Sequence, residues 1–395
     1  MAAPTLDALL AAGVRGRRVF VRADLNVPLA DGRVGDDTRI RATLSTLRRL
    51  AEAGARVIVA SHLGRPKGKP DPKYSLAPVA QRLGELLGRP VAFAADCVGA
   101  PAEAAAARLA DGEVLLLENL RFHAEEEKNE PDFAAALAKL ADVYVNDAFG
   151  TAHRAHASTA GMVPLVARAA AGDLLRSELD HLRRVLAPEH PFLCLLGGAK
   201  VSDKLSVIEA MARRADVVAV GGAMAYTFLR AQGVPVGSSL VEPDREADAR
   251  RVLAAAQASG HALLLPVDHV VAQKIEAGAP QRVVEEIPDG WMGVDIGPET
   301  AAAYAAEAAR ARTIFWNGPM GVFEIEAFAK GTEAVARAVA ASGAHSVVGG
   351  GDSLAAVNKL GLGARITHLS TGGGASLEFV EGRELPGVAA LERAR

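Results

Sequence analysis

Short apolar runs rich in β-branched residues recur along the chain, separated by alanine-rich stretches. The runs cover residues 18–25, 56–61, 91–94, 114–119 and 142–147, and then 191–198, 215–222, 262–271, 313–318, 345–351 and 366–373. Apolar positions repeat at helical spacing in the stretches between them, as in 101–110, 133–140, 301–311 and 332–341. Alternating strands and helices predict parallel sheets with helices on both faces. Runs that are apolar throughout, such as 114–117, are typical of strands buried on both sides.

The runs divide into two sets, and 395 residues are enough for two domains. Between the sets, residues 173–187 carry leucines at helical spacing and predict a connecting helix. We therefore expect an α/β fold of two Rossmann-like domains, each a doubly wound parallel sheet, with a cleft between them. The expected domains are residues 1–172 and residues 188–377.

Glycine turns follow several strand-like runs of the second half. They are at residues 197–198, 221–222, 349–351 and 372–374, each followed by a helical pattern. Ligands of open α/β sheets bind beyond the carboxyl ends of the strands, where glycine lets a phosphate approach the backbone and a helix N-terminus offers free N–H groups. A single turn of this kind is weak evidence, because tight turns use glycine anyway. Four in corresponding positions predict a site lined for phosphate.

The common nucleotide-binding motifs are missing from the sequence. Neither the P-loop pattern G-x-x-x-x-G-K-[ST] nor the dinucleotide pattern G-x-G-x-x-G is present, and the protein-kinase motifs are absent too. These absences argue against a P-loop enzyme and against a nicotinamide-dependent dehydrogenase on the same kind of scaffold.

Charged and polar side chains are distributed unequally between the halves. The first half places a polar or cationic group after most of its strands: Asp24, Asn26, Arg39, His62, Arg65, Arg121 and Arg154. The second half adds other side chains to its glycine turns: Lys200, Lys204, Glu324, Asp352 and Ser353. Arginine binds phosphate and carboxylate in a bidentate manner, and a carboxylate at a helix start suits Mg²⁺ beside phosphate oxygens. The first half is thus predicted to bind a small anion and the second a magnesium nucleotide.

Composition narrows the possible classes of protein. The net charge of -3 gives no overall basic bias, which disfavours nucleic-acid binding. Cys97 and Cys194 each sit beside an apolar run and are expected to be buried free thiols, as in a reducing compartment. The first ten residues do not resemble a secretory signal, and the longest uncharged apolar run, 217–229, is too short to span a membrane. A cytoplasmic protein is expected.

At these same residues the sequence closely resembles the phosphoglycerate kinase family. The matching motifs, in chain order, are VRADLNVPL (21–29), DDTRI (36–40), SHLGRPKGK (61–69), LLLENLRFHAEEEKN (115–129), NDAFGTAHRAHAST (146–159), LLGGAKVSDK (195–204), WNGPMGVFE (316–324), VVGGGDSLAAV (347–357) and THLSTGGGASLEFVEG (367–382). They span nearly the whole chain. Leu25 and Ala23 depart from the phenylalanine and valine usual in the family, which should alter packing only.

The resemblance implies a role for each matching residue. The residues that match the 3-phosphoglycerate site are Asp24, Asn26, Arg39, His62, Arg65, Arg121 and Arg154. Those that match the nucleotide site are Lys200, Lys204, Glu324, Gly350, Gly351, Asp352 and Ser353, with Asp352 as the ligand of Mg²⁺. It also implies that residues 378–395 return to pack on the first domain, and that the protein is a monomer.

The resemblance further implies the reaction, a reversible glycolytic transfer of the acyl phosphoryl group of 1,3-bisphosphoglycerate to MgADP, giving 3-phosphoglycerate and MgATP. Such a transfer needs alignment and charge stabilisation rather than covalent help from the protein. The groups expected at the transferring phosphoryl are Arg39, Lys200 and the backbone at Gly351 and Gly373. No general base is needed, because the acceptor carboxylate is already ionised. Direct in-line transfer on domain closure is expected.

Plainer interpretations stay open at this point. Arg121 and Arg154 could be surface charges, His62 a polar residue at a strand end, and residues 372–374 only a tight turn. Asp352 and Ser353 could cap a helix. A catalytically silent relative would be expected to lose Arg39, Lys200 or Asp352, and all three are present.

Overall fold

The computed structural model describes residues 3–394 and divides into two compact units. The first unit is the chain up to Leu179 together with the segment from Glu384, and the second is Asp180–Arg383. Helix α7 (Asp173–Leu186) contains the point where the first unit gives way to the second. The tail expected from residue 378 starts inside helix α14 (Gly374–Val380) of the second unit, and only the part from Glu384 groups with the first.

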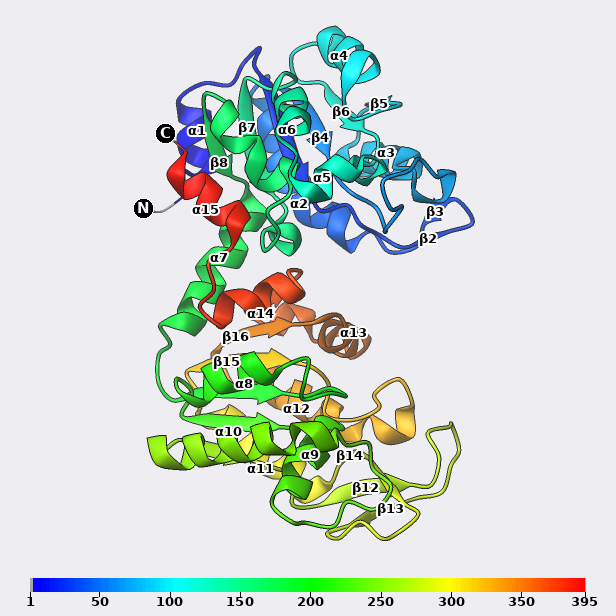
Figure 1. Ribbon diagram of the computed structural model, residues 1–395, viewed down its shortest axis with the longest axis vertical. Coiled ribbons are helices and arrows are strands. Elements are labelled where there is room, and N and C mark those ends of the chain that lie inside the picture. The colour runs from blue at the N-terminus through cyan, green and yellow to red at the C-terminus, as the bar shows by residue number, and fades with distance from the viewer. Residues whose placement is uncertain (1–2, 395) are drawn as a thin grey trace. The chain divides into compact units, whose positions relative to one another are not determined.

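The first unit is built on a six-stranded parallel sheet (Figure 1). Its order is β5-β6-β4-β1-β7-β8, with β1 at Arg18–Ala23, β4 at Arg56–Ala60, β5 at Val91–Ala94, β6 at Val114–Leu117, β7 at Val143–Asp147 and β8 at Ala169–Ala171. The helices of this unit are α1 (Leu6–Ala11), α2 (Thr38–Glu52), α3 (Ala77–Leu87), α4 (Gly99–Arg108), α5 (Ala124–Lys128), α6 (Pro131–Ala138) and α15 (Pro386–Arg393). Leu29–Ala30 and Arg33–Val34 form a short hairpin, β2-β3.

Both faces of this sheet are covered, as the continuous apolar runs predict. On one face Val19 and Val21 of β1 join a core with Leu47 of α2 and Leu83 of α3. Phe20, which alternates with them on β1, is equally buried. The five strands expected in this half are all present. Strand β8 was not expected, because three alanines give little of the β-branched signal that marks a strand.

The second unit repeats this architecture with its own six-stranded parallel sheet. Its order is β11-β10-β9-β15-β16-β17, with β9 at Phe192–Leu196, β10 at Val217–Val220, β11 at Ala262–Leu264, β15 at Thr313–Asn317, β16 at His345–Gly349 and β17 at His368–Ser370. Besides α14, its helices are α8 (Leu205–Ala212), α9 (Met224–Ala231), α10 (Glu246–Ser259), α11 (Pro298–Arg310), α12 (Lys330–Ala341) and α13 (Gly351–Lys359). The core on one face joins Leu195 and Trp316 of the sheet to Tyr304, Val335 and Val357 of α11, α12 and α13.

The expected strand at residues 262–271 is wrong as a single element. The run is two strands, β11 in the parallel sheet and β12 (His269–Ala272) in a separate antiparallel sheet ordered β13-β12-β14. β13 is Gln281–Val284 and β14 is Met292–Ile296. Pro266 and Asp268 separate the two strands, and the Asp268 carboxylate turns away to accept hydrogen bonds from the N–H groups of Glu299 and Thr300 at 2.9 and 2.8 Å. Hydropathy alone does not register such a break.

Helix α7 is fastened to the first sheet by a buried carboxylate. Asp147, the last residue of β7, accepts hydrogen bonds from the backbone N–H groups of Leu174 and Leu175 at 2.9 and 3.3 Å and from the Thr43 hydroxyl at 2.6 Å. Gly172 lies so close that a Cβ there would fall 2.2 Å from this carboxylate. Burial nevertheless raises the pKa of Asp147 to about 6, because desolvation outweighs these hydrogen bonds.

Asp147→Asn should therefore change how stability depends on pH. A carboxyl whose pKa is higher in the folded state than in the unfolded state stabilises the fold while protonated, and this contribution is lost as pH rises from about 4 to about 6. The neutral amide cannot ionise. We therefore expect the free energy of unfolding of the variant to increase relative to that of wild type as pH rises over that interval. Urea unfolding of both proteins at pH values below and above it measures the difference. A difference in the free energy of unfolding that does not change with pH would contradict the raised pKa of Asp147.

Both cysteines, Cys97 and Cys194, are buried free thiols, as expected. Across the described residues, no helix combines the length and the apolar character that crossing a bilayer requires.

Candidate functional site

The polar residues of the first unit gather because their strands are neighbours. β6, β4, β1 and β7 lie side by side and run in parallel, so the loops after them leave the same edge of the sheet. These loops carry Arg121 after β6, His62 after β4, Asp24 and Asn26 after β1, and Arg154 after β7. Arg39 comes from the first turn of α2. The sheet order, which hydropathy cannot give, thus brings distant residues to one place.

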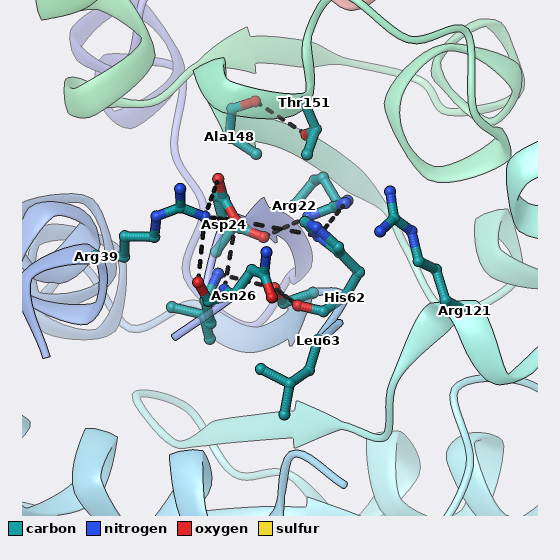
Figure 2. A network of polar contacts seen from close by, with 12 residues as sticks. Arg22, Asp24, Asn26, Arg39, His62, Leu63, Arg121, Ala148 and Thr151 are labelled. Carbon is teal, nitrogen blue, oxygen red and sulfur yellow. Dashed lines mark hydrogen bonds and ion pairs between the residues drawn. The ribbon is translucent and has the colours of Figure 1, made fainter. Parts of the chain in front are cut away.

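Asp24 is the central acidic group of this cluster (Figure 2). Arg39 Nη1 lies 3.3 Å from each of its carboxylate oxygens and donates a further hydrogen bond to the carbonyl of Asn26 at 3.2 Å. The Asn26 side chain accepts a hydrogen bond from the N–H of Gly64 at 2.9 Å. The loops after β1 and β4 are thereby joined, and the Arg39 guanidinium is directed toward the buried Asp24 carboxylate.

His62 is surrounded by positive charge. Its side chain is buried, and its Nδ1 lies 4.0 Å from Asp24 Oδ1, which is too far for a hydrogen bond. Burial lowers the pKa of His62 well below its usual value, and the charges of Arg22, Arg121, Arg154 and Arg39 lower it further. The imidazole is therefore neutral at physiological pH.

Arg121 is a buried cation with spare hydrogen-bonding capacity. Its Nη1 donates to the Gly64 carbonyl at 2.9 Å and its Nε lies 3.2 Å from a carboxylate oxygen of Glu127. Among the described residues, its buried Nη2 has no hydrogen-bond partner. Burial is also the main cause that lowers the pKa of Arg121. An unsatisfied buried guanidinium nitrogen is costly, and an anion placed against it would supply the missing acceptor.

The two remaining residues of the set are less enclosed. Arg154 Nε lies 3.2 Å from His153 Nε2, and its charge acts on His62. Arg65 lies in the same loop after β4 as His62 and is exposed to solvent. By direct contact or charge the structure thus gathers Asp24, Asn26, Arg39, His62, Arg121 and Arg154, and it leaves Arg65 at the surface.

The glycine turns of the second unit also meet at one sheet edge. β10, β9, β15, β16 and β17 are neighbours in that order, and each has a glycine within two residues of its end. Helices begin within two residues of three turns, with α9 at Met224, α13 at Gly351 and α14 at Gly374. The turn at 197–198 differs, because a loop follows it and α8 begins only at Leu205.

Close backbone packing explains part of this glycine content. A Cβ on Gly222 would fall 2.5 Å from the backbone of Gly198, and one on Gly197 would fall 1.9 Å from the carbonyl oxygen of Pro319. Gly350 differs, since its φ of 90° lies in the left-handed region and a Cβ there would come 3.0 Å from the amide nitrogen of Asn317. A side chain at any of these positions would force the loops apart.

Lys204 ties two strands together at this edge. Its Nζ donates to the carbonyl oxygens of Gly197 at 2.5 Å and Asn317 at 2.9 Å, which terminate β9 and β15. Burial lowers the pKa of Lys204 to about 8, although the charge of Asp352 opposes this. The side chain that sequence motifs assign to the nucleotide is also a structural cross-link.

We expect Lys204→Met to lower the free energy of unfolding by about 2 kcal/mol, the usual scale for hydrogen bonds made by a charged group. Methionine keeps the apolar stem but leaves two carbonyl groups without their shared donor. The matched control is Lys200→Met in the same loop, because Lys200 is exposed. Urea unfolding of the two variants gives the comparison, and equal stability of both would refute the cross-link.

The loop after β16 sets the geometry of its acidic residue. Helix α13 starts at Gly351, and Ser353 in its first turn accepts a hydrogen bond from the N–H of Gly318 at 2.6 Å. Ser353 therefore holds the turn after β15 and does not cap its own helix. Asp352, one position earlier, is exposed in the first turn of α13, and its charge acts on Lys204. Lys200 and Glu324 are exposed on neighbouring loops of the same unit.

Metal-ligating groups in the described part of the chain include Asp352 and one cluster in the first unit. Asp352 is a single exposed carboxylate beside glycine turns, which suits Mg²⁺ held mainly by phosphate oxygens and water. Asp96, Cys97 and His123 lie within reach of one ion in the first unit. There His123 Nε2 already lies 2.7 Å from the Asp96 carboxylate, and burial raises the pKa of the Cys97 thiol, which opposes the thiolate form that metals bind.

Comparison with known proteins agrees with this arrangement. The family model described as phosphoglycerate kinase matches residues 9–383. The chain belongs to the phosphoglycerate kinase family. A phosphoglycerate kinase of Moorella thermoacetica is 60% identical over 381 residues, covering 96% of this chain and 97% of the relative. One of Synechococcus elongatus is 54% identical over the full length of both chains.

Solved structures of phosphoglycerate kinases share the fold. The enzyme of Coxiella burnetii superposes with a TM-score of 0.90 at 42% identity and covers 100% of both chains. That of Pyrococcus horikoshii OT3 gives a TM-score of 0.85 at 36% identity over 98% of both chains. The expected fold class and family are both confirmed.

One residue of this phosphoglycerate kinase-type site was missed by the sequence analysis. Arg22 lies in the apolar run of β1, is fully buried and reaches His62. The signal was available, because arginine is almost never fully buried unless it is paired. A charged residue inside a strand that is otherwise apolar indicates a buried functional or structural partner.

Proposed function

We propose that this chain catalyses the reversible transfer of the acyl phosphoryl group of 1,3-bisphosphoglycerate to MgADP, the glycolytic reaction of its family. The first unit would bind the phosphoglycerate and the second the nucleotide. The observation that carries the anion half of this proposal is the arginine cluster around His62, in which the buried Nη2 of Arg121 has no hydrogen-bond partner among residues 3–394. A multiply charged phosphorylated acid supplies the acceptors that such a cluster lacks.

The chemistry asks the chain to align groups and to stabilise charge. The acceptor carboxylate of 3-phosphoglycerate is already ionised, so no side chain has to remove a proton. Asp24, Asn26, His62, Arg65, Arg121 and Arg154 would orient the three-carbon acid, which leaves Arg39 for the transferring phosphoryl. Arg39 is suited to this because its guanidinium is held by Asp24 from one side only and carries further N–H groups.

In the second unit, Lys200, Lys204, Glu324, Gly350, Gly351, Asp352 and Ser353 would contact the nucleotide. Lys200 and the backbone N–H groups at Gly351 and Gly373 would stabilise charge on the phosphoryl oxygens, since both glycines stand at helix starts. Asp352 would hold Mg²⁺, which when bound offsets charge on the nucleotide phosphates. We further propose direct in-line transfer on domain closure, a monomeric state and a cytoplasmic location, with no membrane or nucleic-acid partner.

A coupled assay tests the proposed reaction. The purified protein is mixed with 3-phosphoglycerate, ATP and Mg²⁺, and the acyl phosphate is reduced with NADH by an added dehydrogenase. We expect NADH oxidation that depends on all three additions and stops when Mg²⁺ is chelated. Absence of turnover at high protein concentration would refute the proposal.

A further inference from the structure

Arg22 is a fully buried arginine whose three nitrogens have defined neighbours. It projects from the face of β1 opposite Val21 and the main core. Its Nε donates to the Ser158 hydroxyl at 2.8 Å, its Nη1 donates to the Ala23 carbonyl, and its Nη2 lies 3.3 Å from His62 Nδ1. Figure 2 shows the Arg22 guanidinium directed at the imidazole of His62. The guanidinium is therefore fixed on three sides.

A buried carboxylate balances the charge of Arg22 through one hydroxyl group. Ser158 donates its hydroxyl proton to Glu126 Oε1 at 2.5 Å and its backbone N–H to Glu126 Oε2 at 2.9 Å. Glu126 and Ser158 are both completely buried. Because arginine only donates, the Ser158 oxygen accepts from Arg22, and the Ser158 hydroxyl donates its hydrogen bond to the Glu126 carboxylate. Burial raises the pKa of Glu126, although the charge of Arg22 opposes this. With Glu126 ionised, the direction of every hydrogen bond in the Arg22–Ser158–Glu126 chain is determined.

The same logic determines the protonation of His62. An arginine carries no lone pair, so a hydrogen bond between Nη2 and Nδ1 requires Nδ1 to be the acceptor. In the neutral ring the proton then sits on Nε2. A protonated imidazole would direct an N–H group at a guanidinium N–H group, and two donors cannot form a hydrogen bond with each other. The charged groups that face His62 are Arg22 and Asp24 from β1 and its loop, Arg39 from α2, Arg121 from η2 (Leu120–Phe122) and Arg154 from the loop after β7.

We propose that Arg22, held by Ser158 and Glu126, is a positioning residue that fixes His62 as the neutral Nε2–H tautomer. His62 then donates one neutral hydrogen bond to the bound phosphoglycerate, and the positive charge of the site comes from arginines alone. Binding of the substrate would accordingly not depend on the titration of His62. The substrate part of this inference rests on the proposed function, whereas the tautomer does not.

Nitrogen NMR of the ligand-free protein tests the tautomer directly. In protein labelled with ¹⁵N-histidine and assigned with His62→Gln, we expect His62 to show an unprotonated Nδ1 and a protonated Nε2, unchanged between about pH 5.5 and 8. In Arg22→Met the imidazole loses the donor that fixes Nδ1 as an acceptor, so we expect the single Nε2–H form to give way to a mixture of the two neutral tautomers. Burial and the remaining arginines still lower the pKa of His62 in this variant. A wild-type His62 that carries its proton on Nδ1, or that titrates there, would overturn the proposal.

The kinetic arm uses the Michaelis constant for 3-phosphoglycerate. In wild type His62 should add no pH dependence to this constant. In Arg22→Met the constant should rise roughly twofold at each pH, because Nε2 carries its proton in only part of the molecules. Arg18→Met is the matched control, since Arg18 lies on the same strand in a surface pair with Asp142. A Michaelis constant of Arg22→Met equal to that of wild type would contradict the positioning role.

Removing Arg22 leaves Glu126 buried without its counter-charge, which could prevent folding. The double variant Arg22→Met, Glu126→Gln removes both charges and serves in that case. Ser158→Ala keeps both charges but breaks their link, and its His62 signal should broaden or shift toward that of the double variant. If the NMR result holds but the protein does not bind 3-phosphoglycerate, the proposed function fails and the tautomer assignment stands.

Discussion

Arg39→Ala is expected to lower kcat by about 10²–10³-fold, the usual effect of removing one donor from a developing charge. Its guanidinium is proposed to contact the transferring phosphoryl, in addition to its expected place in the 3-phosphoglycerate site. The affinity for MgADP should stay near wild type, because Arg39 belongs to the first unit and nucleotide binding is proposed for the second. Steady-state kinetics with both substrates varied separate the two effects.

Arg41→Ala is the matched control for this change. Arg41 lies two positions along the same helix, is exposed and pairs with Asp37 at 2.7 Å. It should leave turnover and both Michaelis constants within about twofold, as surface ion pairs contribute little. Wild-type turnover in Arg39→Ala would show that Arg39 does not stabilise the transferring phosphoryl group. Equal losses in the two variants would indicate damage to α2 instead.

The strands that the sequence predicts well are those buried on both faces. Val114–Leu117, Phe192–Leu196 and Val217–Val220 are apolar throughout, as expected of strands covered on both faces. Strands outside the main sheets were missed. Gln281–Val284 is largely exposed and starts with two polar residues, so its pairing with β12 leaves little trace in hydropathy. Tertiary pairing, not local pattern, makes it a strand.

The site could be predicted as a list of residues but not as a geometry. Arg121 and Asp24 are far apart in the chain, and they meet because β6, β4 and β1 are adjacent, an order that no local signal encodes. Motif resemblance supplied the members of the list. It did not show that Lys204 bonds two strand ends, or that Arg121 keeps an unsatisfied nitrogen among the described residues.

Under the proposed function, the two units would bind phosphate in different physical ways. The first relies on side-chain cations, whose mutual repulsion is part of what lowers the pKa of His62 and of Arg121 after burial. The second relies on backbone N–H groups at the starts of α9, α13 and α14, which carry no net charge. An anion would therefore relieve repulsion in the first unit. In the second, a bound Mg²⁺ would offset phosphate charge together with the proposed lysine contacts.

The second large expected effect is on the affinity for MgADP and concerns Asp352. Asp352→Asn keeps the size of the side chain and removes its charge, so we expect affinity for MgADP to fall by at least about tenfold, the scale known for disturbed metal sites. Affinity for ADP without metal should stay unchanged or improve, because a negative charge near the phosphates is lost. Calorimetric titration with ADP, in the presence and absence of Mg²⁺, measures both.

Asp244→Asn serves as the control, because Asp244 is an exposed carboxylate of the same unit in the turn Pro243–Arg245. It should bind both forms of the nucleotide as wild type does. Affinity for 3-phosphoglycerate should be unaffected in either variant, since that ligand is assigned to the first unit. If Asp352→Asn weakened ADP equally with and without Mg²⁺, the residue would act on the nucleotide itself. The proposed division into a cation-lined acid site and a metal-dependent nucleotide site would then be wrong, because Asp352 would not act through Mg²⁺.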